Sequence, residues 1–306
     1  MENQTTYPSK IMLVGEYGVI LGGDALTIPF QKFFARVRST KKLPSGKQKE
    51  VSDSLAYLKK LYLYIKDLPS ASFHAPPDLD HFSEHLTQYW LDMSIPIGYG
   101  LGSSGAVSAA IYDLFFPSSR SVCIQHQKKD LATIESYFHG KSSGVDPLTC
   151  YTGSALHFSA NQHINKVAFD PTQIAGGYRF FLLDSRERFD TGPLVKLFLE
   201  KMGHMEFETI IRDQYLPLNQ KLIETLLGER DADPALLFRI ISDFQLNHFK
   251  EMIPEKMVDL WIEGQVSNEF YLKLNGSGGG YMLGITHHTS MESLEQRWKS
   301  DLLWIG

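Results

Sequence analysis

The chain of 306 residues has only two cysteines, no excess of basic residues and no long apolar run. Two cysteines in so long a chain, Cys123 and Cys150, predict free buried thiols and a reducing, cytoplasmic compartment. The 30 Lys and Arg stand against 35 Asp and Glu, a net charge of −5, which argues against a nucleic acid or an anionic membrane as partner. No segment approaches the ~20 apolar residues of a membrane helix, and the first ten residues lack a basic region, so we expect no signal peptide.

The most informative feature that is present is a glycine-rich turn, IPIGYGLGSSGA at residues 95–106, which leads directly into a helix-compatible segment. Glycines let a backbone approach a ligand closely, and the free N–H groups at the start of a helix favour an anion. The turn therefore predicts a phosphate site. It is no Walker loop, because no Lys follows its glycines. The spacing of Gly100, Gly102 and Gly105 fits the dinucleotide fingerprint, but Gln125 stands where that fold needs an acidic residue.

Hydrophobic patterns predict an α+β protein. We expect strands at residues 11–15, 33–38, 89–95, 155–159, 178–184, 271–274 and 281–285. A helix is predicted to begin at a cap residue, Ser52 or Asp53, and the pattern from residue 190 to 264 is mostly helical with a break at Asp233. Breaker residues gather between positions 160 and 177, which predicts two domains, 1–170 and 171–306.

Glu135 is singled out by its spacing. In the helical pattern of residues 121–138 it shares one face with Leu131, Ile134 and Phe138. Burying a carboxylate without a partner would cost several kcal/mol. We therefore expect a cation or a hydrogen-bond donor beside Glu135, with a carboxylate at the edge of the stripe, in contact with water, as the alternative.

Four segments together resemble the motifs of one superfamily, the GHMP kinases. Residues 8–17 (PSKIMLVGEY) resemble the first motif of this superfamily, and the glycine-rich turn resembles the second. Residues 139–147 (HGKSSGVDP) resemble the segment that carries the catalytic aspartate, and residues 274–280 (LNGSGGG) resemble the third motif. The four occur in the family's order. The resemblance implies an N-terminal domain like ribosomal protein S5, a ferredoxin-like C-terminal domain with the active site between the two, and the use of ATP and magnesium.

The same resemblance implies roles for individual residues. Asp146 would take or orient the proton of the acceptor hydroxyl, and Lys10 would stabilise charge on the transferring group. Ser104 and Glu135 would bind magnesium. In the family pattern the glutamate precedes the aspartate by eleven positions, and Glu135 precedes Asp146 by the same number (146 − 135 = 11). The residues implied for nucleotide binding are Gly98, Gly100, Leu101, Gly102, Ser103, Ser104, Gly105, Gly278 and Gly279, and those for the acceptor are Glu16, Tyr17, Arg188, Thr191 and Ser277.

Each role has a structural alternative. Ser103 could be an ordinary helix cap and Asp146 a turn residue before Pro147. No pair of the eleven histidines has zinc-ligand spacing, so we expect no zinc site.

The segment with Asp146, together with Glu135, most resembles the mevalonate and phosphomevalonate branch of the family. The reaction implied is phosphorylation of mevalonate by ATP to 5-phosphomevalonate, by an enzyme without a nucleic-acid or membrane partner that could form a homodimer. Two residues depart from the pattern of mevalonate kinases: Tyr17 replaces the usual His, and Gly105 the usual Ala. Tyr17 falls where the resemblance places the acceptor pocket, so it bears on the identity of the acceptor. Alternatives are a phosphomevalonate, sugar or heptose kinase, a diphosphate decarboxylase, or a nucleotide-binding regulator without activity.

Overall fold

The computed structural model describes residues 5–42 and 46–306 and divides the chain into two compact units. Unit 1 comprises Met1–Lys10, Pro29–Pro96 and Gly102–Ser154, and unit 2 comprises Ile11–Ile28, Ile97–Leu101 and Ala155–Gly306. Strands β1 (Tyr7–Val14) and β2 (Ala25–Ser39) each continue from one unit into the other. The division of the chain at residue 170 stays a prediction.

The first sheet has the strand order β1-β2-β4-β5, and β3 (Tyr89–Met93) pairs with β2 as well. β4 (Leu156–Phe158) and β5 (Ile164–Lys166) are short. The early part of β2 pairs with β4, with Ala25 opposite Phe158, and its late part with β3, with Ala35 opposite Met93. β2 therefore begins well before the predicted start at residue 33, because the buried residues Ala25, Leu26 and Thr27 pair with β4.

The second sheet belongs to unit 2 and has the order β7-β8-β6-β9 with antiparallel pairs throughout. Its strands are β6 (Tyr178–Asp184), β7 (Phe270–Leu274), β8 (Tyr281–His287) and β9 (Leu302–Trp304). The strand prediction at residues 178–184 is confirmed to the residue. β9 was not predicted, since its three residues carry too little pattern.

The helices of unit 1 are α1 (Gln48–Asp67), α2 (Leu79–His85), α3 (Ser103–Phe115), α4 (Ile124–His139) and α5 (Val145–Thr152). The predicted start of α1 at Ser52 or Asp53 is wrong: the helix begins one turn earlier, after Lys47, with no side-chain cap. Val51 is buried in that first turn, so packing extends the helix beyond the polar residues that resemble a cap. Three buried alanines, Ala106, Ala109 and Ala110, lie on α3.

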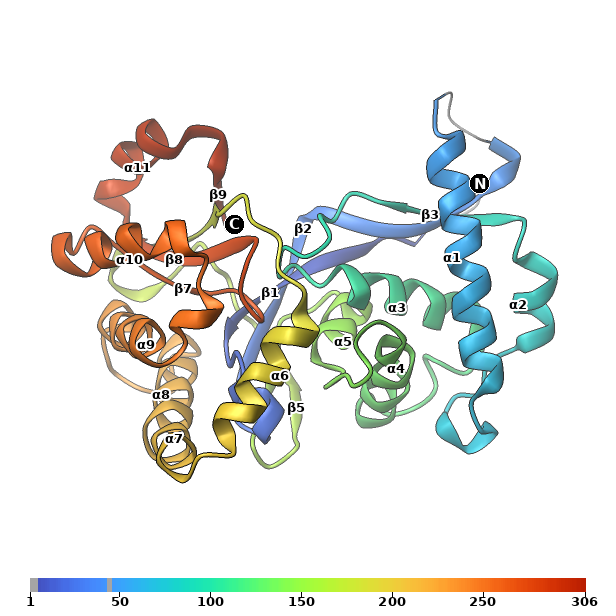
Figure 1. The fold of residues 1–306 in the computed structure, drawn as a ribbon, viewed down its shortest axis with the longest axis horizontal. Helices are drawn as coiled ribbons and strands as arrows, with labels where there is room; N and C mark the ends of the chain where they lie inside the picture. Colours follow the sequence, from blue (N-terminus) through green and yellow to red (C-terminus); the bar gives the residue numbers. More distant parts are fainter. Residues whose placement is uncertain (1–4, 43–45) are drawn as a thin grey trace. The chain divides into compact units, whose positions relative to one another are not determined.

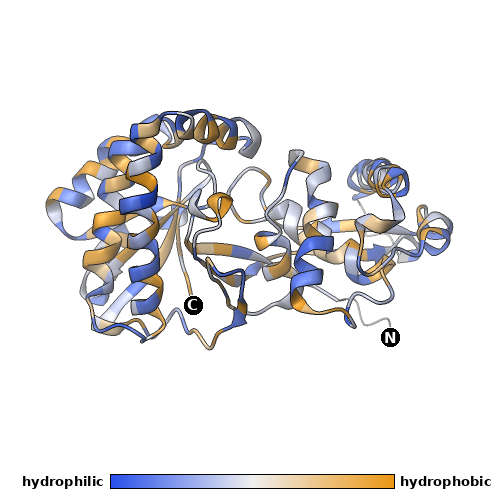
Figure 2. Cartoon of the chain, turned by 90° about the horizontal axis from the view of Figure 1, so that it is seen from below, coloured by the Kyte–Doolittle hydropathy of each residue, from blue (hydrophilic) through white to orange (hydrophobic). Residues whose placement is uncertain are grey.

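The helices of unit 2 are α6 (Thr191–Met202), α7 (Met205–Ile210), α8 (Leu216–Leu226), α9 (Pro234–His248), α10 (Glu255–Ser267) and α11 (Met291–Trp298). The predicted break at Asp233 is confirmed: its side chain accepts a hydrogen bond from the Ala235 N–H at 2.9 Å and caps α9. α9 and α10 pack against β7 (Figure 1). Hydrophobic and hydrophilic residues are mixed along these helices (Figure 2), as expected for helices with one buried face.

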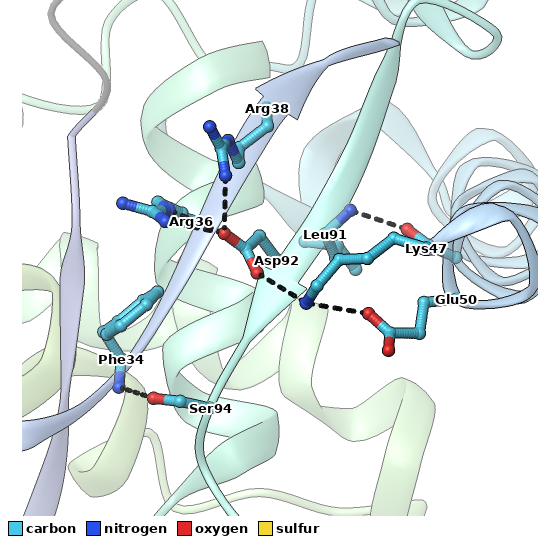
Figure 3. A network of polar contacts seen from close by, with 9 residues as sticks. Phe34, Arg36, Arg38, Lys47, Glu50, Leu91, Asp92 and Ser94 are labelled. Carbon is cyan, nitrogen blue, oxygen red and sulfur yellow. Dashed lines mark hydrogen bonds and ion pairs between the residues drawn. The ribbon is translucent and has the colours of Figure 1, made fainter. Parts of the chain in front are cut away.

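A polar network holds β2, β3 and the start of α1 together in unit 1 (Figure 3). The carboxylate of Asp92 on β3 accepts hydrogen bonds from Arg36 at 2.7 Å and Arg38 at 3.2 Å, both on β2, and Lys47 lies 3.8 Å from it. Glu50 pairs with the same lysine at 2.9 Å. Ion pairs at such a partly exposed edge add little stability.

The cysteines are unpaired, as predicted, but only Cys150 is buried; Cys123 is exposed. The prediction that both thiols are buried is wrong for Cys123, which directly precedes α4 at the surface. Among the helices of the described residues, none combines the length and apolar character needed to cross a bilayer.

Candidate functional site

The predicted catalytic pair meets in unit 1. The Nζ atom of Lys10, on β1, lies 3.0 Å from Oδ2 of Asp146 in the first turn of α5. The Lys10 side chain is 1% exposed, whereas that of Asp146 is 29% exposed. A buried ammonium group paired with a carboxylate that still reaches solvent leaves the carboxylate accessible to a ligand. The turn alternative for Asp146 does not account for this ion pair with a residue from the first motif.

Two glycines allow the close packing around this pair. A Cβ on Gly102 would lie 2.8 Å from Cγ of Lys10, so the lysine stem runs directly against the glycine-rich turn. A Cβ on Gly105 would lie 2.9 Å from the backbone nitrogen of Pro147. Gly105, the departure from the family's usual Ala, therefore lets the start of α3 contact the turn of α5 that carries Asp146.

Glu135 has the hydrogen-bond donors that its spacing predicts. Its side chain projects from α4 and is buried; Oε1 accepts a hydrogen bond from Ser104 Oγ at 2.9 Å and Oε2 one from Ser142 Oγ at 2.5 Å. The alternative of a carboxylate in contact with water is thus excluded. Ser142 was not singled out by the sequence reasoning, although it lies in the HGKSSGVDP segment; it also accepts a bond from the Gly144 N–H at 2.9 Å and so links Glu135 to the turn before Asp146.

Burial, and after it the nearby negative charge of Asp146, raises the pKa of Glu135 from 4.5 to about 7. The hydroxyls of Ser142 and Ser104 and the charge of Lys10 oppose that rise. A buried carboxylate that holds a proton near neutral pH beside a second carboxylate is a place where a cation could replace that proton. The set of one carboxylate and one serine hydroxyl offers the hard oxygen ligands that Mg²⁺ prefers, so these residues fit a magnesium ion.

Ser103 is the first residue of α3, and the alternative that it is an ordinary helix cap is not seen: the cap position is Gly102, with a φ of 70° and no side-chain hydrogen bond. The N-terminal N–H groups of α3 follow this left-handed residue, as expected for an anion-binding turn. Leu101 is 1% exposed, so its side chain anchors the turn in the core, and only its backbone could contact a nucleotide.

In unit 2, the beginning of the glycine-rich turn lies against the third motif. A Cβ on Gly100 would stand 2.3 Å from the carbonyl oxygen of Asn275, and one on Gly280 would stand 2.2 Å from Cα of Tyr99. Since these partners are backbone atoms, no side chain fits at either position. The two glycine-rich segments that the sequence predicts for nucleotide binding therefore contact each other backbone to backbone.

The segment that follows β6 contacts both of these glycine-rich segments. The Gly280 N–H donates to the Glu187 carbonyl at 2.6 Å, and a Cβ on Gly279 would stand 2.6 Å from Cβ of Phe189. Gly98 lies over Arg188, whose Cβ would be 3.5 Å from an added Cβ. Gly278 instead lies against the backbone of Met252: a Cβ on Gly278 would stand 2.3 Å from the carbonyl oxygen of Met252.

Three of the acceptor candidates are also together in unit 2. Ser277 Oγ donates to Thr191 Oγ1 at 3.1 Å, and the Tyr17 hydroxyl donates to the Ser277 carbonyl at 2.5 Å. The ring of Tyr17 packs against Phe198 and Phe249, and burial raises the pKa of its hydroxyl. Tyr17 is thus a neutral, largely buried support for the third motif.

Sequence reasoning missed the partner of Glu16. Glu16 and Lys273 form a hydrogen-bonded ion pair in which both side chains are fully buried. Lys273 also donates a hydrogen bond at 2.9 Å to the carbonyl of Leu274, the first residue of the third motif. The signal that could have indicated the pair was a lysine within an apolar strand pattern together with the glutamate at the end of the first motif, because buried charges need partners.

Comparisons with known proteins agree with the motifs. The family model of the GHMP kinases N terminal domain matches residues 58–154. The mevalonate kinase of Pyrococcus horikoshii is 26% identical over 202 residues, which cover 61% of this chain and 55% of that protein, so the chain spans about half the length of this relative. The mevalonate kinase of Pyrococcus abyssi is 23% identical over 305 residues, covering 89% of this chain and 85% of the other.

Solved structures share the fold over the whole chain. The L. major mevalonate kinase in complex with R-mevalonate matches with a TM-score of 0.67 at 14% identity, covering 99% of this chain and 95% of that one. The Streptococcus pneumoniae phosphomevalonate kinase in complex with phosphomevalonate and AMPPNP matches with a TM-score of 0.65 at 14% identity, covering 99% of each chain. The four motifs in order and the matching domain model make the chain similar to the GHMP kinases, and its α+β fold is the one that these solved kinases share.

Proposed function

We propose that the protein transfers the terminal phosphoryl group of ATP to the primary alcohol of mevalonate, giving 5-phosphomevalonate and ADP. The observation that carries the proposal is the arrangement in unit 1 of the Lys10–Asp146 ion pair and the Ser104–Glu135 hydrogen bond around the beginnings of α3 and α5. The two curated relatives of the chain, both mevalonate kinases, support mevalonate as the acceptor.

In the proposed reaction the acceptor oxygen forms a bond to the γ-phosphorus as the bond from that phosphorus to the bridging oxygen of ADP breaks. Asp146, the more exposed member of its ion pair, accepts a hydrogen bond from the acceptor hydroxyl and receives its proton. Lys10 keeps its positive charge beside the reacting oxygen and stabilises the charge that develops there. The N–H groups of the glycine-rich turn and the start of α3 hold the phosphates.

We further propose that Ser104 and Glu135 hold a magnesium ion, which when bound would neutralise charge on the phosphates. Glu135 must lose its proton for this, and Ser142 then keeps the carboxylate oriented through its hydrogen bond to Oε2. For the acceptor we propose Arg188, Thr191 and Ser277, which lie next to the glycine-rich segments of unit 2. Direct contacts of Glu16 and Tyr17 with the acceptor, a homodimer and a cytoplasmic location stay predictions.

The test is coupled ADP release with ATP and magnesium across mevalonate, 5-phosphomevalonate, galactose, a heptose phosphate and homoserine. Turnover with mevalonate alone is the expected result. Turnover only with phosphomevalonate or a sugar would preserve the phosphoryl-transfer roles and replace the acceptor. ADP binding without turnover on any acceptor would instead favour the nucleotide-binding regulator, and CO2 release with ADP formation from a diphosphate would favour the decarboxylase.

A further inference from the structure

Asn275 has a buried side chain without a hydrogen-bond partner. It follows β7, its side chain is 0% exposed, and within the described ranges 5–42 and 46–306 neither Nδ2 nor Oδ1 has a hydrogen-bond partner. A buried polar group left without a partner destabilises the folded state. Since such groups are rare in folded proteins, each one calls for a physical explanation.

The chain around Asn275 is held firmly. The N–H of Leu274 donates to Oε1 of Gln245 at 2.8 Å, and the carbonyl of Leu274 accepts a hydrogen bond from Lys273 at 2.9 Å. Gln245 in turn donates to the hydroxyl of Tyr215 at 2.9 Å. With both backbone groups of the preceding residue engaged in a buried network, Asn275 cannot easily leave its place to find a partner elsewhere.

The neighbour of the Asn275 carboxamide is the glycine-rich turn. Nδ2 would lie 3.3 Å from a Cβ on Gly100, and Gly100 has a φ of 74°, a conformation that side chains rarely adopt. The residues of this turn that belong to unit 2, Ile97–Leu101, present backbone N–H and C=O groups, and a turn rich in glycine can change its φ and ψ angles at little cost. The turn is therefore the part of unit 2 that can supply hydrogen-bond partners to Asn275 by a small rearrangement.

We propose that Asn275 is a positioning residue for the glycine-rich turn, whose carboxamide becomes hydrogen-bonded to the backbone of residues 97–101 when nucleotide phosphates bind there. This inference rests on the proposed function, because it requires that the turn binds phosphates. The unsatisfied carboxamide raises the free energy of the nucleotide-free state, and the bound state recovers that energy. Asn275 thus contributes to nucleotide affinity without itself contacting the nucleotide.

The test compares two buried side-chain amides of unit 2, one without hydrogen-bond partners and one with two. Asn275→Leu replaces a carboxamide that lacks partners with an apolar side chain of similar shape, whereas Gln245→Met removes a carboxamide that has two. Thermal unfolding is measured without nucleotide and with ADP, and the dissociation constant of ADP is measured by calorimetry without an acceptor. We expect Asn275→Leu to keep or raise the unfolding midpoint without nucleotide and to weaken ADP binding about tenfold. Gln245→Met should lower the midpoint.

A lower midpoint for Asn275→Leu without nucleotide would overturn the inference, since it would show that the carboxamide stabilises the free protein. Unchanged ADP affinity in this variant would overturn it as well. If the larger side chain prevents folding, Asn275→Ala is measured in the same way and must show the same loss of ADP affinity. Failure of the wild-type protein to bind ADP would refute the proposed function instead, because that measurement does not involve Asn275.

Discussion

Replacing Glu135 with glutamine should make the protein more stable at alkaline pH. Burial raises the pKa of Glu135 to about 7 from 4.5, so between these values the folded protein keeps a proton that the unfolded chain has released. The folded state then binds more protons, and the free energy of unfolding falls as the pH rises. Above pH 7 the loss is complete, and at about 1.4 kcal/mol for each pH unit it amounts to about 3 kcal/mol.

Glutamine stays neutral at every pH and keeps the shape of the side chain. Its carbonyl oxygen can accept the hydrogen bond of Ser104, while its amide group can donate to the hydroxyl oxygen of Ser142. Glu135→Gln should therefore match the wild type near pH 5 and exceed it by up to about 3 kcal/mol at pH 8, in the absence of magnesium.

The assay is urea unfolding from pH 5 to 8.5 with EDTA, and the matched control is Glu84→Gln, which changes an exposed carboxylate on α2 of the same unit. The control should follow the wild-type curve. Parallel pH curves for Glu135→Gln and the wild type, or a less stable variant at pH 8, would refute the reasoning, because either result means that the buried carboxylate is ionised at no cost.

Three further predictions concern the site and its supports. Asp146→Asn and Lys10→Met should leave ADP affinity within about threefold of wild type and lower kcat by at least about 10³-fold; near-normal turnover in either variant would remove the pair from the mechanism. Gly105→Ala places a methyl group 2.9 Å from the backbone of Pro147 and should lower both the unfolding midpoint and kcat, whereas Gly192→Ala, at an open position on α6, should change neither. Lys273→Met leaves Glu16 buried without its cation and should cost about 3–5 kcal/mol of unfolding free energy; the double variant with Glu16→Met should recover most of that loss, and equal losses in single and double variants would contradict a paired charge.

Local patterns in the sequence were enough to predict several elements of the fold. The strand at residues 178–184 and the break at Asp233 could be predicted because an apolar run and a capping dipeptide act over a few residues. The start of α1 and the early start of β2 could not, since burial of Val51 and pairing of Ala25 with Phe158 depend on distant segments. Similarly, β9 exists only through its pairing with β6.

For the site, the four motifs indicated the superfamily, and the position of Glu135 on an apolar face predicted that it needs a partner. The sequence by itself therefore predicted the kind of chemistry, because these glycine, serine and carboxylate residues occur together in four motifs that resemble one superfamily. Only the tertiary structure decided the partners, Ser142 for Glu135 and Lys273 for Glu16, and left the carboxamide of Asn275 buried without one beside Gly100. The physical reason is that a buried polar group acts through neighbours brought close by packing, and no periodicity along the chain specifies which distant residue that will be.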